Sequence, residues 1–399
     1  MKRVILLILC LCMGISMIGC SETAGTSEIT SESTGESLIE SLEESSLESV
    51  EESQGVVEPE VLPTVTVNVI DNLTTAGETR YFRTVGRTFT RNGGLACDLS
   101  CTGIRFNASC KGDIKVNFSV TGDCYFTVYV NGERQEERIV VRQADSGTFR
   151  KVATLETYGK YEIEIVKQSQ YPMAYSQIKE VQIAGSFEKR PSERDRFIEF
   201  YGDSVMNGSN IYTGGTSAAT SDATKAFGYS TARNLNADCN VIGRGGMALY
   251  RNGNTDGMLE IWDLCGGKSS PEVCQYNFAR IPDCVVIELG TNDYLAGSYS
   301  DKKFTDGIKE IIFNIRSVYG EDVKIIWCYG YNEHVDATWE VAKTALDGLN
   351  GNGTVYYCRL PYSCLSKADG GDGIHPDETL AQGMADALTA FITDNIYTV

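Results

Sequence analysis

The chain has 399 residues and a formal net charge of −19, from 35 basic and 54 acidic side chains. This length exceeds that of a typical single domain, so we expect two folded units with appendages. The acidic balance disfavours nucleic acid as a partner, whereas a neutral polymer or a small neutral ester is compatible with it.

The N-terminus has the layout of an export signal. Two basic residues precede an apolar run over residues 4–18, which is shorter than the roughly 20 residues of a spanning helix. The run ends at Gly19 and Cys20 in a sequence that resembles a bacterial lipobox, in which Cys20 would carry the lipid. We expect residues 1–20 to be a lipoprotein-type signal peptide of an extracellular, cell-surface bacterial protein, with plain cleavage and secretion as the alternative. The lipid anchor would then be the only contact with the membrane.

Residues 21–62 are rich in Ser, Glu, Thr and Gly and contain few apolar residues. Such a segment cannot bury a core, and its like charges repel one another. We therefore expect a disordered tether that connects the anchor to the folded part.

The chain contains fourteen cysteines. Export permits disulfides, and the close spacing of three pairs makes local bridges conceivable, although spacing alone does not assign them. These pairs are Cys97 with Cys101, Cys265 with Cys274, and Cys358 with Cys364. No tight Cys/His cluster of the kind that zinc requires occurs, so we expect no metal.

Residues 63–190 are predicted to form an all-β domain. Short runs alternate between apolar and polar residues with the period of a half-buried strand. Asn131–Gly132 between two such runs indicates a tight hairpin. The economical fold is a sandwich, jelly-roll-like. The predicted strands include residues 103–106, 114–120, 125–130, 133–141, 160–166 and 180–183.

Residues 191–399 change to apolar strands that alternate with helix-length amphipathic segments. This rhythm predicts a parallel sheet covered by helices on both faces, an α/β domain of three layers (αβα). The predicted strands are 197–201, 240–243, 284–289, 323–329 and 354–360, and the predicted helices are 223–235, 304–318, 334–349 and 377–396.

Three of these strands end in residues that suit a catalytic cleft. Ser204 follows the first strand, Gly243 ends the second, and Asn292 follows the third. Ligands of parallel sheets bind at the carboxyl ends of the strands, so we expect the three residues to lie together.

Asp372 and His375, near the C-terminus, supply the other groups that a serine nucleophile needs. An imidazole activates a serine hydroxyl by taking its proton, and a carboxylate orients and stabilises that imidazole. Pro376 is expected at the first position of a helix, which would hold His375 at a helix start. Ser204, His375 and Asp372 are therefore the predicted catalytic residues, and no cofactor is needed.

Hydrolysis of an ester also needs donors aimed at the developing oxyanion. The backbone amide of Ser204, a backbone amide from the segment 243–246 and the side-chain amide of Asn292 are the candidates.

The order Gly-Asp-Ser, glycine turn, Gly-Thr-Asn-Asp and Asp-x-x-His resembles the four blocks of the SGNH, or GDSL, hydrolase superfamily. The resemblance implies a flavodoxin-like sheet, Ser204 as nucleophile, His375 as base, and Ser204, Gly243 and Asn292 as oxyanion donors. Gly245 lies close enough to Gly243 in the sequence to be an alternative.

A β domain before such a hydrolase, together with Gly243-Arg244-Gly245 and Tyr250-Arg251-Asn252, looks like carbohydrate esterase family two. That resemblance implies removal of acetyl groups from plant polysaccharides such as xylan and glucomannan. Some members lack the acid, so a Ser–His dyad is the alternative to a triad. Other possible functions are hydrolysis of another exported ester, such as peptidoglycan O-acetyl groups or short-chain esters, and glycan binding without catalysis.

Tyrosines at or after the strand ends are candidates for substrate binding. Tyr294 and Tyr331 could form a floor on which sugar rings stack, as could Tyr329. Packing in the core or in loops explains the same residues equally well.

Overall fold

The computed structural model describes residues 59, 61–73, 80–171, 173–329, 333–361 and 372–397, without the side chains of 333–337. The predicted signal peptide with Cys20 and nearly all of the predicted tether lie outside these residues, as do Tyr331 and Cys364. No helix within the described ranges is long and apolar enough to cross a membrane.

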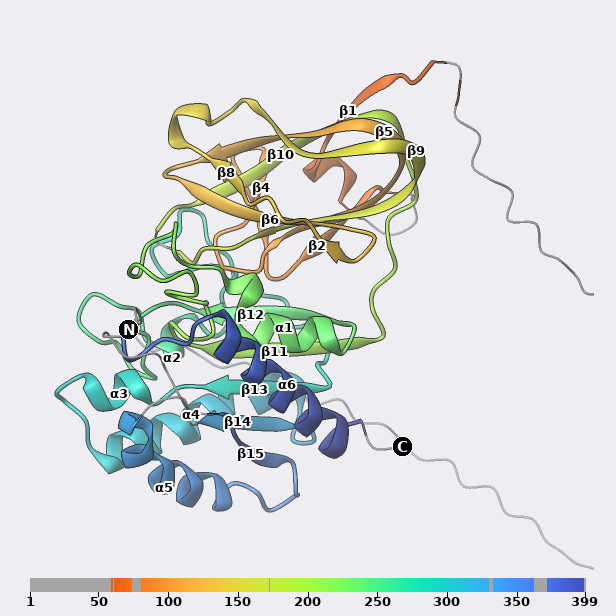
Figure 1. Ribbon diagram of the computed structural model, residues 1–399. Helices are drawn as coiled ribbons and strands as arrows, with labels where there is room; N and C mark the ends of the chain where they lie inside the picture. Colours follow the sequence, from red (N-terminus) through yellow and green to blue (C-terminus); the bar gives the residue numbers. More distant parts are fainter. Residues whose placement is uncertain are drawn as a thin grey trace, which may run out of the picture. The chain divides into compact units, whose positions relative to one another are not determined.

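The first half of the described chain is one curled antiparallel sheet (Figure 1). Its main path is β3-β4-β10-β5-β9-β6-β7, with β1 on β10, β2 on β5 and β8 on β6. Register shifts interrupt the pairing of β5 with both β9 and β10, and such irregularities bend strands. The strands are β1 (Thr64–Asn68), β2 (Phe82–Val85), β3 (Phe89–Arg91), β4 (Gly94–Ala96), β5 (Gly103–Val120), β6 (Cys124–Val130), β7 (Glu133–Arg134), β8 (Ile139–Val141), β9 (Phe149–Lys167) and β10 (Ser176–Phe187).

The predicted hairpin at Asn131–Gly132 is confirmed. Both residues have positive φ, 52° and 84°, as a two-residue turn that follows the strand twist requires. The single strand predicted over 133–141 is wrong, because residues 135–138 separate β7 from β8. Arg138 leaves the ladder and donates hydrogen bonds to Ala219 O at 2.7 Å and to the side chain of Gln168 at 2.8 Å.

The second half is a five-stranded sheet in which every pair is parallel. Its order β12-β11-β13-β14-β15 is the 2-1-3-4-5 order of flavodoxin-like sheets. All residues of β13 and β14 are buried, as expected for central strands with helices on both faces. The strands are β11 (Arg196–Gly202), β12 (Ala237–Gly243), β13 (Cys284–Glu288), β14 (Ile325–Tyr329) and β15 (Val355–Arg359).

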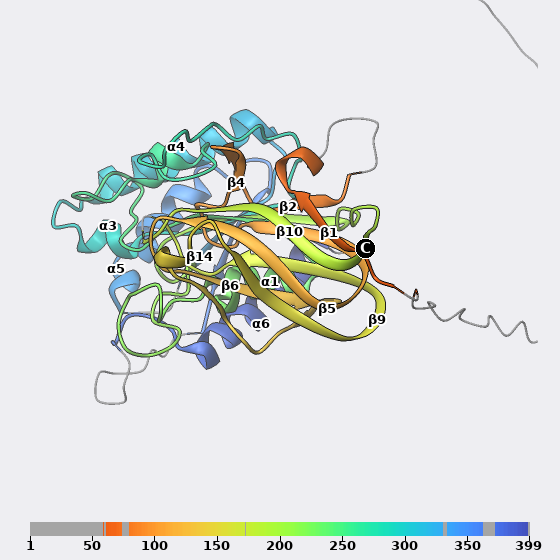
Figure 2. The same cartoon turned by 90° about the horizontal axis from the view of Figure 1, so that it is seen from above.

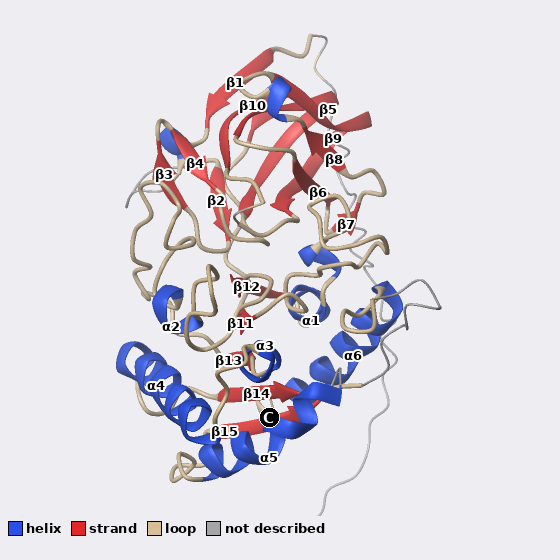
Figure 3. Cartoon of the chain, turned by 90° about the vertical axis from the view of Figure 1, so that its left-hand side faces the viewer, coloured by secondary structure: helices blue, strands red, loops and turns tan. Residues whose placement is uncertain are grey.

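Helices cover both faces of this parallel sheet. The helices α1 and α6 pack together on one face, and α2 and α4 lie on the other (Figure 2; Figure 3). The helices are α1 (Phe227–Asn234), α2 (Met258–Ile261), α3 (Thr291–Leu295), α4 (Asp301–Tyr319), α5 (Glu333–Asp347) and α6 (Glu378–Asn395), with short 3₁₀ turns at Ile70–Asn72, Gln143–Asp145 and Ala223–Lys225.

The last helix starts later than predicted. Asp377 is the residue that caps α6, and its side chain accepts a hydrogen bond from Leu380 N at 2.8 Å. Pro376 therefore precedes the cap and does not take the first helical position, because an aspartate side chain satisfies the free amides of the first turn. His375 still lies just before the helix.

The two halves share buried contacts. The guanidinium of Arg87, which follows β2, lies 2.9 Å from the carboxylate of Glu199 in β11, and both side chains are fully buried. Arg87 also donates to the hydroxyl of Tyr201 at 2.8 Å. Residues of the antiparallel half, such as Leu99 and Tyr171, belong to the same core cluster as the parallel sheet.

Candidate active site

The turn that carries Ser204 directly follows β11. A side chain on Gly202 would place its Cβ only 2.5 Å from Cβ of Met206, so the chain can turn back this closely only with glycine there. Asp203 is buried, and its Oδ1 accepts a hydrogen bond from Val205 N at 2.9 Å. Asp203 thus braces the turn, and Ser204 remains half-buried at its tip.

A chain of three side chains joins Ser204 to the loop before α6. The Oγ of Ser204 lies 2.8 Å from Nε2 of His375, and Nδ1 of His375 lies 2.6 Å from Oδ2 of Asp372. Asp372 Oδ1 also accepts from the backbone amides of Ile374 at 2.9 Å and His375 at 2.8 Å. The carboxylate therefore fixes both the ring and the backbone of His375.

These hydrogen bonds lower the pKa of Asp372 and so favour its ionised form. Burial by itself would raise the pKa of Asp372, but the backbone and ring N–H groups of His375 and the amide of Ile374 outweigh it and hold the pKa below its usual value. An ionised carboxylate next to an imidazole stabilises the imidazolium that forms when the ring takes a proton.

The glycine loop 243–246 lies beside the serine turn. A Cβ on Gly243 would lie 2.0 Å from the backbone oxygen of Gly202, and one on Gly245 would lie 3.7 Å from Cβ of Ser204. Only glycine permits this approach of β12 to β11 at Gly243. The amide of Gly245 already donates a short hydrogen bond to the side chain of Gln170.

Asn292 lies in the first turn of α3, shortly after β13 as predicted, and contacts the serine turn. Its Nδ2 donates to Asp203 Oδ2 at 2.7 Å and to Met247 O at 3.1 Å. Both hydrogens of the amide therefore have acceptors within the protein.

Asp293, the next residue, holds the segment that follows the glycine loop. Its two carboxylate oxygens lie 3.1 and 3.2 Å from Leu249 N. Burial, with a smaller contribution from the charge of Asp203, raises the pKa of Asp293 to about 7, although the bond from Leu249 N opposes the rise.

The antiparallel half contributes residues to the site that no motif in the sequence marks. The hydroxyl of Ser100 donates a short hydrogen bond to Asn207, whose side chain in turn donates to Asp203 O at 2.7 Å. Gln170, which follows β9, bonds to Gly245 as described above. The loops of this half therefore support both the serine turn and the glycine loop.

The tyrosines predicted as candidates for sugar binding differ in exposure and packing. Tyr294 is 39% exposed and packs edge-on against Tyr299, with ring centroids 5.5 Å apart. Tyr329 is buried, and its hydroxyl lies 2.3 Å from where a Cβ on Gly290 would be, so the core-packing interpretation is confirmed for it. Tyr331 lies outside the described residues.

The described part of the chain has no group of three or more His, Cys, Asp or Glu side chains that could hold a metal ion. Cys97, Cys101, Cys265, Cys274 and Cys358 are all free thiols in the structure. Cys265 and Cys274 nevertheless lie on paired segments, with Cys265 N donating to Cys274 O at 3.0 Å. Cys358 pairs in register with Cys328 of the neighbouring strand.

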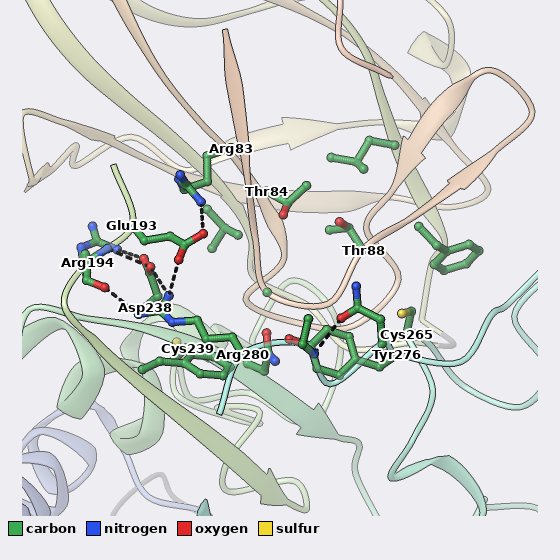
Figure 4. A pocket seen from close by; sticks show the side chains of 18 of the residues that line it. Arg83, Thr84, Thr88, Glu193, Arg194, Asp238, Cys239, Cys265, Tyr276 and Arg280 are labelled. Atoms are coloured by element: carbon green, nitrogen blue, oxygen red, sulfur yellow. Dashed lines mark hydrogen bonds and ion pairs between the residues drawn. The ribbon is translucent and has the colours of Figure 1, made fainter. Parts of the chain in front are cut away.

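A cavity of about 940 Å³ lies between the two halves, away from this site. Phe197 and Asp238, which line it, are at the amino ends of β11 and β12, whereas Ser204 follows the carboxyl end. Figure 4 shows ion pairs across the lining, among them Arg83–Glu193 at 2.6 Å and Arg280–Asp238 at 2.8 Å. We assign this cavity to the contact between the halves.

Comparisons with known proteins agree with this architecture. No protein-family model matches the chain. The cellulase/esterase CelE of Acetivibrio thermocellus is 32% identical over 227 residues, which are 53% of this chain and 27% of that protein. The chain thus spans about a quarter of that relative's length.

Solved structures cover more of the chain. A family two carbohydrate esterase from Clostridium thermocellum, in complex with cellohexaose, is 24% identical with a TM-score of 0.67 and covers 78% of this chain and 98% of that one. An acetyl xylan esterase from Butyrivibrio proteoclasticus is 16% identical with a TM-score of 0.70 and covers 83% and 98%. The predicted resemblance to carbohydrate esterase family two is confirmed, and at these identities it establishes the fold.

Proposed function

We propose that the protein is a serine esterase that removes O-acetyl groups from plant polysaccharides such as xylan and glucomannan. The observation that carries the proposal is the continuous chain from Ser204 through His375 to Asp372, with contacts of 2.8 and 2.6 Å. The fold shared with family two esterases, one of them an acetyl xylan esterase, supports the substrate class.

The reaction follows from the roles of these groups. His375 Nε2 takes the proton of Ser204 as its Oγ attacks the acetyl carbonyl, and Asp372 stabilises the resulting imidazolium. His375 then gives the proton to the departing sugar oxygen, which leaves an acetyl group on Ser204. Water activated by His375 hydrolyses this acetyl-enzyme in a second, equivalent step. We favour the triad over the dyad because Asp372 bonds directly to the ring.

The oxyanion that forms in each step needs donors. The backbone amide of Ser204 and that of Gly243 are our candidates, because the amide of Gly245 is engaged by Gln170. Asn292 joins them when its amide exchanges the longer bond, 3.1 Å to Met247 O, for the oxyanion. Each such donor contributes about 3 kcal/mol to the stabilisation of the transition state.

Features outside the described site complete the proposal. We infer from the sequence that Cys20 carries a lipid anchor and that residues 21–62 tether an extracellular enzyme to the cell surface. Such a tether would let the enzyme meet an acetylated polymer outside the cell. We further infer that the antiparallel half is a jelly-roll-like sandwich, and that Tyr294 and Tyr331 contribute to sugar binding. The domain boundaries at 62–63 and 190–191 stay predictions.

Acetate release from acetylated xylan, acetylated glucomannan and O-acetylated peptidoglycan tests the substrate class. The purified protein should release acetate from the plant polymers, and a Ser204→Ala variant should release none. Release from peptidoglycan alone would replace the proposed substrate with a bacterial one, and release from none would favour a glycan-binding protein without catalysis.

A further inference from the structure

The segment that joins β9 to β10 brings a glutamine side chain to the edge of the active site. Gln170 is only 7% exposed, and its side-chain oxygen accepts the hydrogen bond from Gly245 N. A Cβ placed on Gly245 would lie 3.1 Å from Nε2 of Gln170 and 3.7 Å from Cβ of Ser204. Gln170 and Ser204 therefore both lie close to Gly245.

The next residue of the segment contacts the same loop. The guanidinium carbon of Arg244 lies 5.5 Å from the ring centroid of Tyr171. Tyr171 is itself fully buried. Its ring packs so closely on Gly267 that a Cβ on Gly267 would lie 1.8 Å from Cε2 of Tyr171. Two consecutive residues of the antiparallel half thus contact two consecutive residues of the glycine loop, and the ring of Tyr171 is packed closely against Gly267.

The glycine loop needs such support. Three of the four residues 243–246 are glycine, and Gly246 adopts a φ of 76°. Glycines lose more conformational freedom on folding than any other residue, so a loop of this composition is not rigid by itself. Stabilisation of an oxyanion depends on donors held in place before the reaction, and a displacement of about 1 Å can cost two orders of magnitude in rate.

We infer that Gln170 is a positioning residue for ester hydrolysis: it fixes the glycine loop through the amide of Gly245, so that the amide of Gly243, the loop donor proposed above, stays aimed at the oxyanion. This inference rests on the proposed function for its effect on rate, but the fixation of the loop can be measured independently. The active site then depends on the antiparallel half, because the residue that fixes its oxyanion loop comes from that half.

Three variants of the full chain test the inference. Gln170→Leu removes the acceptor at similar size, whereas Gln170→Glu retains an acceptor for Gly245 N. Gln177→Leu is the matched control, because Gln177 is also 7% exposed but lies on β10, next to Gly94. Two quantities are measured for each variant. The first is hydrogen exchange, followed by mass spectrometry on a peptide that contains residues 243–247. The second is the steady-state kinetics of 4-nitrophenyl acetate hydrolysis.

In Gln170→Leu we expect exchange of the loop amides to be at least about 10-fold faster, and kcat to fall about 10- to 100-fold with KM within about twofold. Gln170→Glu should restore the protection of the loop, and Gln177→Leu should leave both protection and kcat as in the parent. Unchanged loop exchange in Gln170→Leu would overturn the inference, as would an equal loss in Gln177→Leu. A parent that hydrolyses no ester would refute the proposed function, while the exchange data would still decide the role of Gln170.

Discussion

Asp293→Asn should remove a pH-dependent loss of stability that originates in the first turn of α3. Burial raises the pKa of Asp293 from an ordinary value of 3.8 to about 7 in the folded protein. The folded state therefore binds this proton more tightly than the unfolded state. Below a pH of about 4, Asp293 is protonated in both states and its burial costs no ionisation energy. As the pH rises through 7, the free energy of unfolding falls progressively, because the buried carboxyl group must ionise in the folded state.

The size of the effect follows from the shift. A rise of about three pKa units corresponds to about 4 kcal/mol in total, of which about 2.6 kcal/mol develops between pH 5 and pH 8. Because Asp293 is only half-buried, we reduce this to about 2 kcal/mol. Asparagine cannot ionise, and its side-chain oxygen can still accept the hydrogen bond from Leu249 N.

Urea denaturation at pH 5, 6, 7 and 8 measures this difference. The stability of Asp293→Asn relative to the parent should grow by about 2 kcal/mol from pH 5 to pH 8. Asp306→Asn is the control, because Asp306 is exposed and pairs with the exposed Lys302, and its difference from the parent should stay within about 0.5 kcal/mol. A pH-independent difference for Asp293→Asn, or one that shrinks toward pH 8, would show that Asp293 does not have a raised pKa in the folded protein.

Three further predictions address other parts of the site and fold. Asp372→Asn should lower kcat by up to about 10⁴-fold with little change in KM, because the ring of His375 loses the group that orients and stabilises it; a loss of less than about tenfold in steady-state kinetics would indicate a dyad. Arg87→Leu should cost about 3–5 kcal/mol in urea denaturation, because it leaves the carboxylate of Glu199 buried without its cation; a cost below about 1 kcal/mol would contradict the assigned contact. Tyr294→Ala should raise KM for acetylated xylan several-fold and leave hydrolysis of 4-nitrophenyl acetate unchanged; equal effects on both substrates would exclude a role in sugar binding.

The sequence predicted the arrangement of the site where the signal was local. Ser204 and Asn292 follow apolar strands, and Asp372 lies three residues before His375. Parallel strands end at one edge of a sheet, so the positions of the strands were enough to bring Ser204 and Asn292 together. The same reasoning could not foresee that both hydrogens of Asn292 would find acceptors, because that depends on distances within the folded loops.

Contacts between the two halves could not be predicted from any local sequence pattern. Gln170 and Gly245 are 75 positions apart, and Ser100 and Asn207 are 107 positions apart. Neither Gln170 nor Ser100 belongs to a motif, and nothing in the local pattern distinguishes them from other polar loop residues. The break between β7 and β8 escaped prediction for a similar reason, because Arg138 turns toward residues about 80 positions away.

Capture of the acetyl-enzyme on Ser204 would identify both the nucleophile and the acyl intermediate of the proposed reaction. The parent and Ser204→Ala are mixed with 4-nitrophenyl acetate, quenched in acid within the first turnover and digested for mass spectrometry. We expect one added acetyl group on the peptide that contains Ser204 in the parent, and neither that adduct nor turnover in the variant. An acetyl group on another residue, or undiminished hydrolysis by Ser204→Ala, would contradict the proposed role of Ser204.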